Sequence, residues 1–167
     1  MENDNILNIA NHSSKSLKFF MKEEKEEIIT APAPEGFVDE EGNLLELEIK
    51  IIPNARVQEI FQNYTKRSVA RNNKGVPYVA ANNEALYTVD RDNARAVRHI
   101  IVESLVYPNL RDPELMKFYK CNDITEMPNK VFPKTAQYAH VSKMIMDALG
   151  LGDNVADEEG LIDDAKN

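Results

Sequence analysis

The chain has 167 residues and a formal net charge of −8, from 28 acidic and 20 basic side chains. This acidic balance repels phosphate backbones and anionic lipid, which argues against nucleic acid and membrane surfaces as partners. Cys121 is the single cysteine, so no intramolecular disulfide is available. No apolar run approaches the roughly 20 residues of a membrane span, and we therefore expect a cytoplasmic protein.

The first part of the chain, residues 1–12, is polar and rich in asparagine, so we expect a flexible arm there. Ser13 and Ser14 follow, and either side chain is a suitable N-cap for a short helix. The apolar residues after them recur at helical spacing and define one face of this predicted helix: Leu17, Phe20 and Met21.

The clearest strand lies at residues 44–52, where apolar and charged side chains alternate with a period of two. Two β-prone stretches at residues 28–30 and 37–38 precede it and are separated from each other by prolines. We predict a small antiparallel sheet from these three stretches, over about residues 28–52. The buried face of its main strand consists of Leu45, Leu47, Ile49 and Ile51.

The stretch after this strand has apolar residues at helical spacing and predicts a helix with Asn54 as its N-cap. Its face continues as far as Ser68, and the polar run at residues 72–75 ends it. Residues 76–89 are ambiguous, because two β-prone stretches flank an Asn-Asn pair and are compatible with a hairpin.

A broad apolar stripe over residues 94–106 predicts a central helix, capped by Asp90 or Asp92. The sequence Asp-Pro-Glu at residues 112–114 predicts the next helix start. It combines a capping carboxylate, a proline in the first turn and a second carboxylate near the positive end of the helix dipole.

A short helical turn interrupted by Pro128 follows, and the last helix runs over about residues 133–149. The whole pattern predicts an α+β fold, in which the small antiparallel sheet packs against about five helices in one domain over residues 13–151. Residues 152–167 are acidic and lack a hydrophobic period, so we expect a disordered acidic tail.

Sequence signatures of catalysis and of metal binding are absent. No glycine-rich phosphate loop, H-E-x-x-H pair of histidines or paired C-x-x-C motif occurs. His99 and Glu103 are four residues apart on a predicted helix. A pair with this spacing is far more often a surface or half-buried pair than part of a metal or acid–base site. We therefore expect no enzyme, no cofactor and no metal.

Basic side chains concentrate between residues 56 and 111, and tyrosines lie among them. Such a surface could bind the phosphate backbone of a nucleic acid. The alternative is that they balance the acidic sheet edge and the acidic tails, within the molecule or across a dimer. We favour this alternative, so nucleic acid is disfavoured as a partner and a homo-oligomer stays open. The residues concerned are Arg56, Lys66, Arg67, Arg71, Lys74, Arg91, Arg95, Arg98 and Arg111.

The last predicted helix carries a candidate partner-binding face of aromatic, methionine and aliphatic side chains. Packing in the core is the default interpretation of such a face. Unbranched thioether side chains also repack readily against variable partners, which keeps partner binding open as the alternative. The face consists of Tyr138, Val141, Met144, Ile145 and Leu149.

One further pattern, an aromatic-Pro-Asn-Leu turn followed by a D-x-x-L helix start and a tyrosine, lies between residues 107 and 119. It consists of Tyr107, Pro108, Asn109, Leu110, Asp112, Leu115 and Tyr119. With the order of the upstream elements, it resembles the XkdN-like tail assembly chaperones of long-tailed bacteriophages and prophages, over about residues 14–150. Two departures are Lys120 and Gln137, where family members tend to carry glycine and glutamate.

The resemblance implies a non-catalytic role in the cytoplasm of a bacterial host. Such chaperones are thought to coat the tape-measure protein and to recruit tail-tube subunits. They then leave, so the protein is expected to be absent from the mature virion. Two other functions stay open: a structural tail or baseplate adaptor and, with less support, a nucleic-acid-binding regulator.

Overall fold

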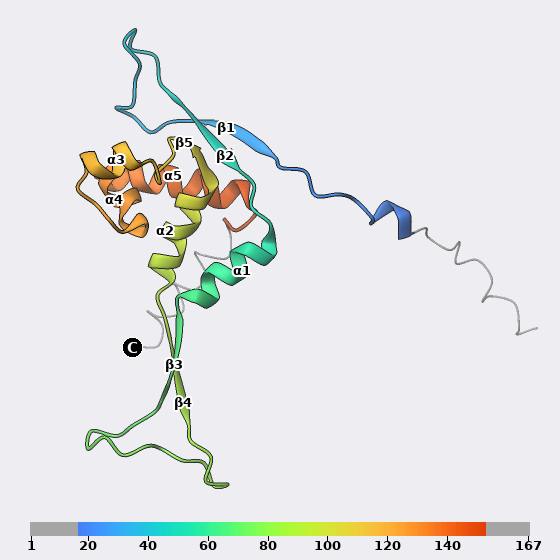
Figure 1. The fold of residues 1–167 in the computed structure, drawn as a ribbon, viewed down its shortest axis with the longest axis vertical. Coiled ribbons are helices and arrows are strands. Elements are labelled where there is room, and N and C mark those ends of the chain that lie inside the picture. Colours follow the sequence, from blue (N-terminus) through green and yellow to red (C-terminus); the bar gives the residue numbers. More distant parts are fainter. Residues whose placement is uncertain (1–16, 153–167) are drawn as a thin grey trace, which may run out of the picture.

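The computed structural model describes residues 17–152. The expectations for residues 1–16 and 153–167, namely the flexible arm, the serine helix cap and most of the acidic tail, lie outside it. Figure 1 shows a body that contains the α-helices and a three-stranded sheet. Besides the loop that follows β1 (Ile28–Pro32), two segments project from this body: the chain before β1, and a two-stranded ribbon formed by β3 (Thr65–Val69) and β4 (Tyr87–Arg91).

The three-stranded sheet is antiparallel, with β2 (Glu46–Lys50) between β1 and β5 (Leu105–Tyr107). Leu47 and Ile49 on β2 are buried, while the two glutamates that alternate with them are exposed. This confirms the alternation predicted for the main strand, because successive side chains of a strand point to opposite faces.

The third strand of this sheet is not the predicted one. The expected strand at residues 37–38 is reduced to a single bridge between Val38 and Leu44. The third position is taken by β5, although Leu105 was predicted to continue the central helix. In β5, Leu105 pairs with Ile49 of β2, so the backbone leaves the helix and completes the sheet.

The first α-helix, α1 (Asn54–Asn63), has Pro53 in the cap position and Asn54 already inside the helix, so the predicted cap at Asn54 is wrong. The helix also ends earlier than predicted. Its expected continuation to Ser68 is wrong, because the chain from Thr65 onward forms β3. At the junction, the hydroxyl of Thr65 donates a hydrogen bond of 2.9 Å to the carbonyl of Phe61. β3 pairs along its whole length with β4, and these strand hydrogen bonds replace the helical ones that a longer α1 would have formed.

The tip of the ribbon contains the predicted hairpin in a reduced form. Val79 and Ala85 form an isolated bridge, and Asn83 between them has a left-handed conformation with φ of +64°. A second turn has Gly75 at φ of +79°, a conformation that residues with a side chain rarely adopt. These two turns allow the chain to fold back twice between β3 and β4.

The second helix, α2 (Asn93–Ser104), is the centre of the body and packs against α1, β2, β5 and α5 (Thr135–Ala148). Of the two predicted caps, Asp92 is used: its carboxylate accepts a hydrogen bond of 2.9 Å from the backbone of Arg95. The stripe that α2 buries consists of Ala96, Ile100, Ile101 and Val102.

The helix start at residues 112–114 is confirmed, because α3 spans Pro113–Phe118 with the side chain of Asp112 as its cap. Pro128 does not interrupt a helical turn as predicted. It lies in the first turn of α4 (Met127–Val131), where a missing N–H costs no hydrogen bond. Two short 3-10 helices, η1 (Leu17–Phe19) and η2 (Ile124–Glu126), complete the described part. Its small antiparallel sheets and five α-helices confirm the α+β class.

Candidate interaction surfaces

Glu103 on α2 is the centre of an ion-pair cluster that joins α2 to α1. Arg56 of α1 donates to both carboxylate oxygens of Glu103, at 2.6 Å from Nε to Oε1 and 2.8 Å from Nη2 to Oε2. Two further groups lie near Oε2 of Glu103: Arg111 Nη2 at 3.5 Å and His99 Nε2 at 3.6 Å. The predicted pair of His99 and Glu103 is therefore part of a partly buried cluster that connects two helices.

Two pKa values in this cluster are shifted. Hydrogen bonds from Arg56 are the main cause that lowers the pKa of Glu103, against the opposing effect of burial. Burial lowers the pKa of His99 and outweighs the Glu103 charge, which raises it. The Tyr64 hydroxyl, at the end of α1, lies 3.0 Å from Nδ1 of His99. Both shifts favour a charged carboxylate beside a neutral imidazole at neutral pH.

The first half of the motif that carries the family resemblance builds a turn. β5 ends at Tyr107, and the peptide bond from Tyr107 to Pro108 is cis. The side-chain oxygen of Asn109 accepts a hydrogen bond of 3.0 Å from the backbone of Arg111. Leu110, which lies between Asn109 and Arg111 in the chain, is fully buried. The turn therefore directs the chain from the sheet into α3.

The second half of the motif positions α3. Asp112 Oδ1 accepts hydrogen bonds from the backbone of Glu114 at 2.9 Å and of Leu115 at 3.1 Å. The side chains of Leu115 and Tyr119 pack, partly buried, against the hydrophobic core. The rings of Tyr119 and Phe118 meet edge to face with centroids 5.0 Å apart. Contact of these motif residues with a partner stays a prediction.

The candidate partner-binding face of α5 is turned toward the core. Val141 and Ile145 are buried, while Tyr138, Met144 and Leu149 are partly buried and pack against the same core. The structure thus brings the five predicted side chains together on one side of α5 and places them against the body. Binding of a partner to this face stays a prediction.

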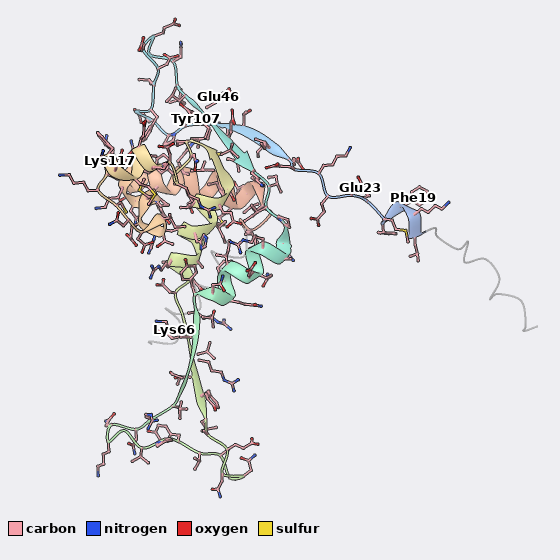
Figure 2. All side chains as sticks on the ribbon, in the orientation of Figure 1. Phe19, Glu23, Glu46, Lys66, Tyr107 and Lys117 are labelled. Atoms are coloured by element: carbon pink, nitrogen blue, oxygen red, sulfur yellow. The ribbon has the colours of Figure 1, made fainter. Side chains whose placement is uncertain are left out.

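The N-terminal segment, which we define as residues 17–27, displays large apolar side chains away from the body. Figure 2 labels Phe19 and Glu23 on it. The exposed fractions are 69% for Leu17, 76% for Phe19, 82% for Phe20 and 74% for Met21. Clustered apolar surface of this kind marks sites of protein interaction, so this segment is the first candidate interaction surface.

The ribbon, residues 65–91, provides a second candidate surface. Directly opposed residues of antiparallel strands share a face, and here Arg67 opposes Val89 while Val69 opposes Tyr87. The Arg67 guanidinium lies over the ring of Tyr87, 4.1 Å from its centroid. We call this side, which is exposed at Arg67, Tyr87, Val89 and Arg91, the ribbon face. It consists of Arg67, Val69, Tyr87, Val89 and Arg91.

The opposite side of the ribbon is polar. Lys66 opposes Asp90, and Ser68 opposes Thr88 with their hydroxyl oxygens 3.0 Å apart. Lys66, labelled in Figure 2, lies near the point where the ribbon leaves the body. The ribbon therefore has one apolar and basic face and one face of hydroxyl and charged groups.

The basic residues between positions 56 and 111 divide into two groups. Those of the body pair with carboxylates: Arg95 with Asp123 at 2.7 Å and Arg98 with Glu126 at 3.0 Å, besides the two arginines around Glu103. The charges are thus balanced within the molecule, but by carboxylates of α1, α2 and the η2 region and not by the sheet edge that the prediction named. Over residues 17–152, the ribbon's basic side chains are exposed and form no ion pair: Lys66, Arg67, Arg71, Lys74 and Arg91.

Sequence reasoning missed the ribbon face because it placed Ser68 on a helix. A usable signal was present: Thr65–Val69 begins and ends with β-branched residues, and Tyr87–Arg91 contains tyrosine, threonine and valine, all of which favour strands. In the N-terminal segment, Leu17, Phe20 and Met21 were identified but Phe19 was not. The exposure of these side chains depends on what packs over them and cannot be read from their spacing.

The described part of the chain has neither a metal-binding cluster nor a membrane-spanning helix. Within residues 17–152, no group of three or more His, Cys, Asp or Glu side chains is arranged to hold a metal ion. Cys121 is buried, and its Sγ lies 3.2 Å from the carbonyl oxygen of Asp123. Among the described helices, none is long and apolar enough to cross a membrane.

Known proteins resemble this chain over most of its length. A family profile described as Phage XkdN-like tail assembly chaperone protein, TAC, matches residues 17–166. The Phage-like element PBSX protein XkdN of Bacillus subtilis (strain 168) is 30% identical over 159 residues, which cover 94% of this chain and 97% of that protein. The uncharacterized protein YqbN of the same strain is 30% identical over 151 residues, covering 89% of this chain and 93% of YqbN. A crystal structure of the protein yqbn has a TM-score of 0.60 at 25% identity, covering 81% of this chain and 96% of that chain.

Proposed function

Because the chain belongs to the family of XkdN-like phage tail assembly chaperones, we propose that it binds the tape-measure protein of its own phage and helps to recruit tail-tube subunits, without catalysing a reaction. In this proposal it acts in the cytoplasm of the bacterial host and leaves before the tail is complete. It is therefore expected to be absent from the mature virion.

The observation that carries this proposal is the display of apolar side chains on a segment that projects from the body. Phe19 and Phe20 are more than three-quarters exposed, although burial of one such side chain stabilises by roughly 1.5–3 kcal/mol. A long client that exposes apolar helical stripes before assembly offers matching surface. Covering it would keep both proteins from aggregating.

The experiment is co-expression of the full chain with the tape-measure protein of the same phage. We expect a soluble complex that purifies at a fixed ratio. The double variant Phe19→Ser and Phe20→Ser should lose most of the complex, because it removes the apolar contact without touching the core. The matched control is Phe118→Ser on α3, since Phe118 is equally exposed at 77% but lies on the body.

Two results would count against the proposal. If the chain and the tape-measure protein form no complex, the client is wrong. If Phe118→Ser lowers the yield as much as the double variant does, general surface hydrophobicity rather than the N-terminal segment accounts for binding.

A structural tail or baseplate adaptor is the second candidate, because exposed projecting segments also suit a permanent joint between tail proteins. Mass spectrometry of purified virions separates the two. A chaperone should be missing from the particle, whereas an adaptor should be present at a fixed number of copies per tail.

A further inference from the structure

The ribbon face is an unpartnered sheet face in the described part of the chain. A two-stranded hairpin is at best marginally stable by itself in water. This one nevertheless displays Tyr87 and Val89 with exposed fractions of 50% and 54%. Arg67 and Arg91 lie on the same face. A partner that covers it must supply apolar side chains together with negative charge.

The charge of the ribbon is opposite to that of the chain as a whole. The ribbon has five basic residues and only two acidic ones, Glu84 and Asp90, in a protein with a net charge of −8. As described above, none of the five basic side chains is used in an ion pair within the described residues. Their charge is therefore available to attract an acidic segment.

Residues 153–167 have the complementary composition. They contain six acidic residues against the single Lys166, and the apolar pair Leu161-Ile162 lies between Glu158-Glu159 and Asp163-Asp164. The family profile extends to residue 166, so this segment belongs to the matched region. We infer that residues 153–167 dock on the ribbon face of the same chain, with carboxylates beside its arginines and Leu161-Ile162 over its apolar side chains.

The segment is long enough to reach the ribbon. Fifteen residues span at most roughly 50 Å when extended. They follow α5, which packs on α2, and the ribbon leaves the body next to the first residue of α2. A helix of twelve residues such as α2 is about 18 Å long, so the reach exceeds the distance along α2 to the base of the ribbon.

The N-terminal segment is a poorer match for the same face. It has four glutamates but also three lysines, and Glu26 already pairs with Lys50 at 2.8 Å. A segment tethered to the same chain also has a high effective concentration, which favours docking within one molecule over docking on a second copy.

One consequence rests on the proposed function: a client that binds the ribbon face must first displace residues 153–167.

The test uses the full chain with a spin label on an Asn167→Cys residue and with Cys121→Ala, so that one thiol reacts. Docking predicts broadening of the backbone amide signals of β3 and β4 at low salt, and loss of this broadening at high salt, where charges are screened within about 3 Å at 1 M. The amide spectrum of each variant also reports whether it is folded.

Two variants of equal charge change separate face-specific docking from general attraction. Arg67→Glu alters the ribbon face and should weaken docking at least about fivefold, since the loss of one ion contact in water alone accounts for that factor and the reversed charge adds repulsion. The broadening should fall accordingly. Lys66→Glu alters the opposite face and should weaken it by less than about twofold, because its charge acts only at longer range. If Arg67→Glu disturbs the fold, Arg91→Glu tests the same face from β4.

Three results would overturn the inference. The first is an unbroadened ribbon at low salt. The second is an equal loss in Lys66→Glu and Arg67→Glu, which would make the ribbon face irrelevant. The third is equal broadening when a spin-labelled chain is mixed with an isotope-labelled chain that carries no spin label, which would place the segment on a second copy. None of these results depends on a tape-measure protein, so they are separate from failure of the proposed function.

Discussion

Replacement of Glu103 by glutamine tests the ion-pair cluster that holds the two helices flanking the ribbon. The variant keeps the shape of the side chain but removes the negative charge. Arg56 then loses a charged acceptor at 2.6 and 2.8 Å, and Arg111 and His99 lose their nearest carboxylate. The guanidinium of Arg56 then keeps only Glu59, its more exposed partner at 2.8 Å, as a matching charge.

The expected loss lies between two limits. Removing one partner of a fully buried ion pair costs roughly 3–5 kcal/mol, whereas a surface pair contributes under about 1 kcal/mol. The side chains of Glu103 and Arg56 are 18% and 33% exposed, so we expect a loss of about 2 kcal/mol. With a urea dependence of about 2 kcal/mol per molar, the unfolding midpoint should fall by about 1 M.

The dependence on pH distinguishes charge from shape. The Arg56 hydrogen bonds lower the pKa of Glu103 in the folded protein, so the unfolded chain takes up this proton first as the pH falls. The stability gained from the charged Glu103 is therefore fully present above its ordinary pKa near 4.5 and is lost as the pH falls through the lowered value. The wild type and Glu103→Gln should differ at pH 7 and converge toward pH 3.

Urea unfolding followed by circular dichroism at pH 7 and at pH 3 measures both quantities. Glu59→Gln is the matched control, because Glu59 pairs with the same Arg56 at 2.8 Å but is 58% exposed. It should cost less than about 0.5 kcal/mol. The reasoning fails if the two variants lose the same stability, or if the deficit of Glu103→Gln is unchanged at pH 3.

Three further predictions concern the core, a helix cap and a histidine. Ile100→Ala on α2 should lower the free energy of unfolding by about 3 kcal/mol in the same urea assay, since Ile100 is fully buried; a loss under about 1 kcal/mol would contradict this packing. Asp112→Ala should cost about 1 kcal/mol and Asp112→Asn much less, because asparagine can still accept the capping hydrogen bonds; equal losses would rule out capping. Burial lowers the pKa of His99, so the wild type should lose stability relative to His99→Gln as the pH falls below about 6.5, with no relative change above pH 7.5.

Several elements were predictable because their signals lie within a few neighbouring residues. The alternation around β2, the capping carboxylate at Asp112 and the positions of α3 and α5 all follow from side-chain period and local hydrogen bonding. The pairing of body arginines with carboxylates was also expected from the charge balance. Their partners, such as Asp123 for Arg95, come from a distant part of the chain and were not identified.

The errors share one physical cause. β3 and β5 were both assigned to helices, and in each case strand pairing with a distant segment replaced local helical hydrogen bonds. The hydroxyls of Ser68 and Thr88, which meet across the ribbon, are 20 residues apart in sequence. Intrinsic helix and strand preferences differ by less than about 1 kcal/mol per residue, so such pairing readily overrides them.

The sequence alone was sufficient to establish the α+β class, the acidic character and the resemblance that the family profile later matched over residues 17–166. Exposure, by contrast, is a property of how elements pack, and spacing does not reveal it. The apolar face of α5 lies against the core, while the equally apolar Leu17–Phe19 turn and the ribbon face lie in solvent. The difference arises because α2 packs against α5, whereas no element of the described chain covers the two projecting segments.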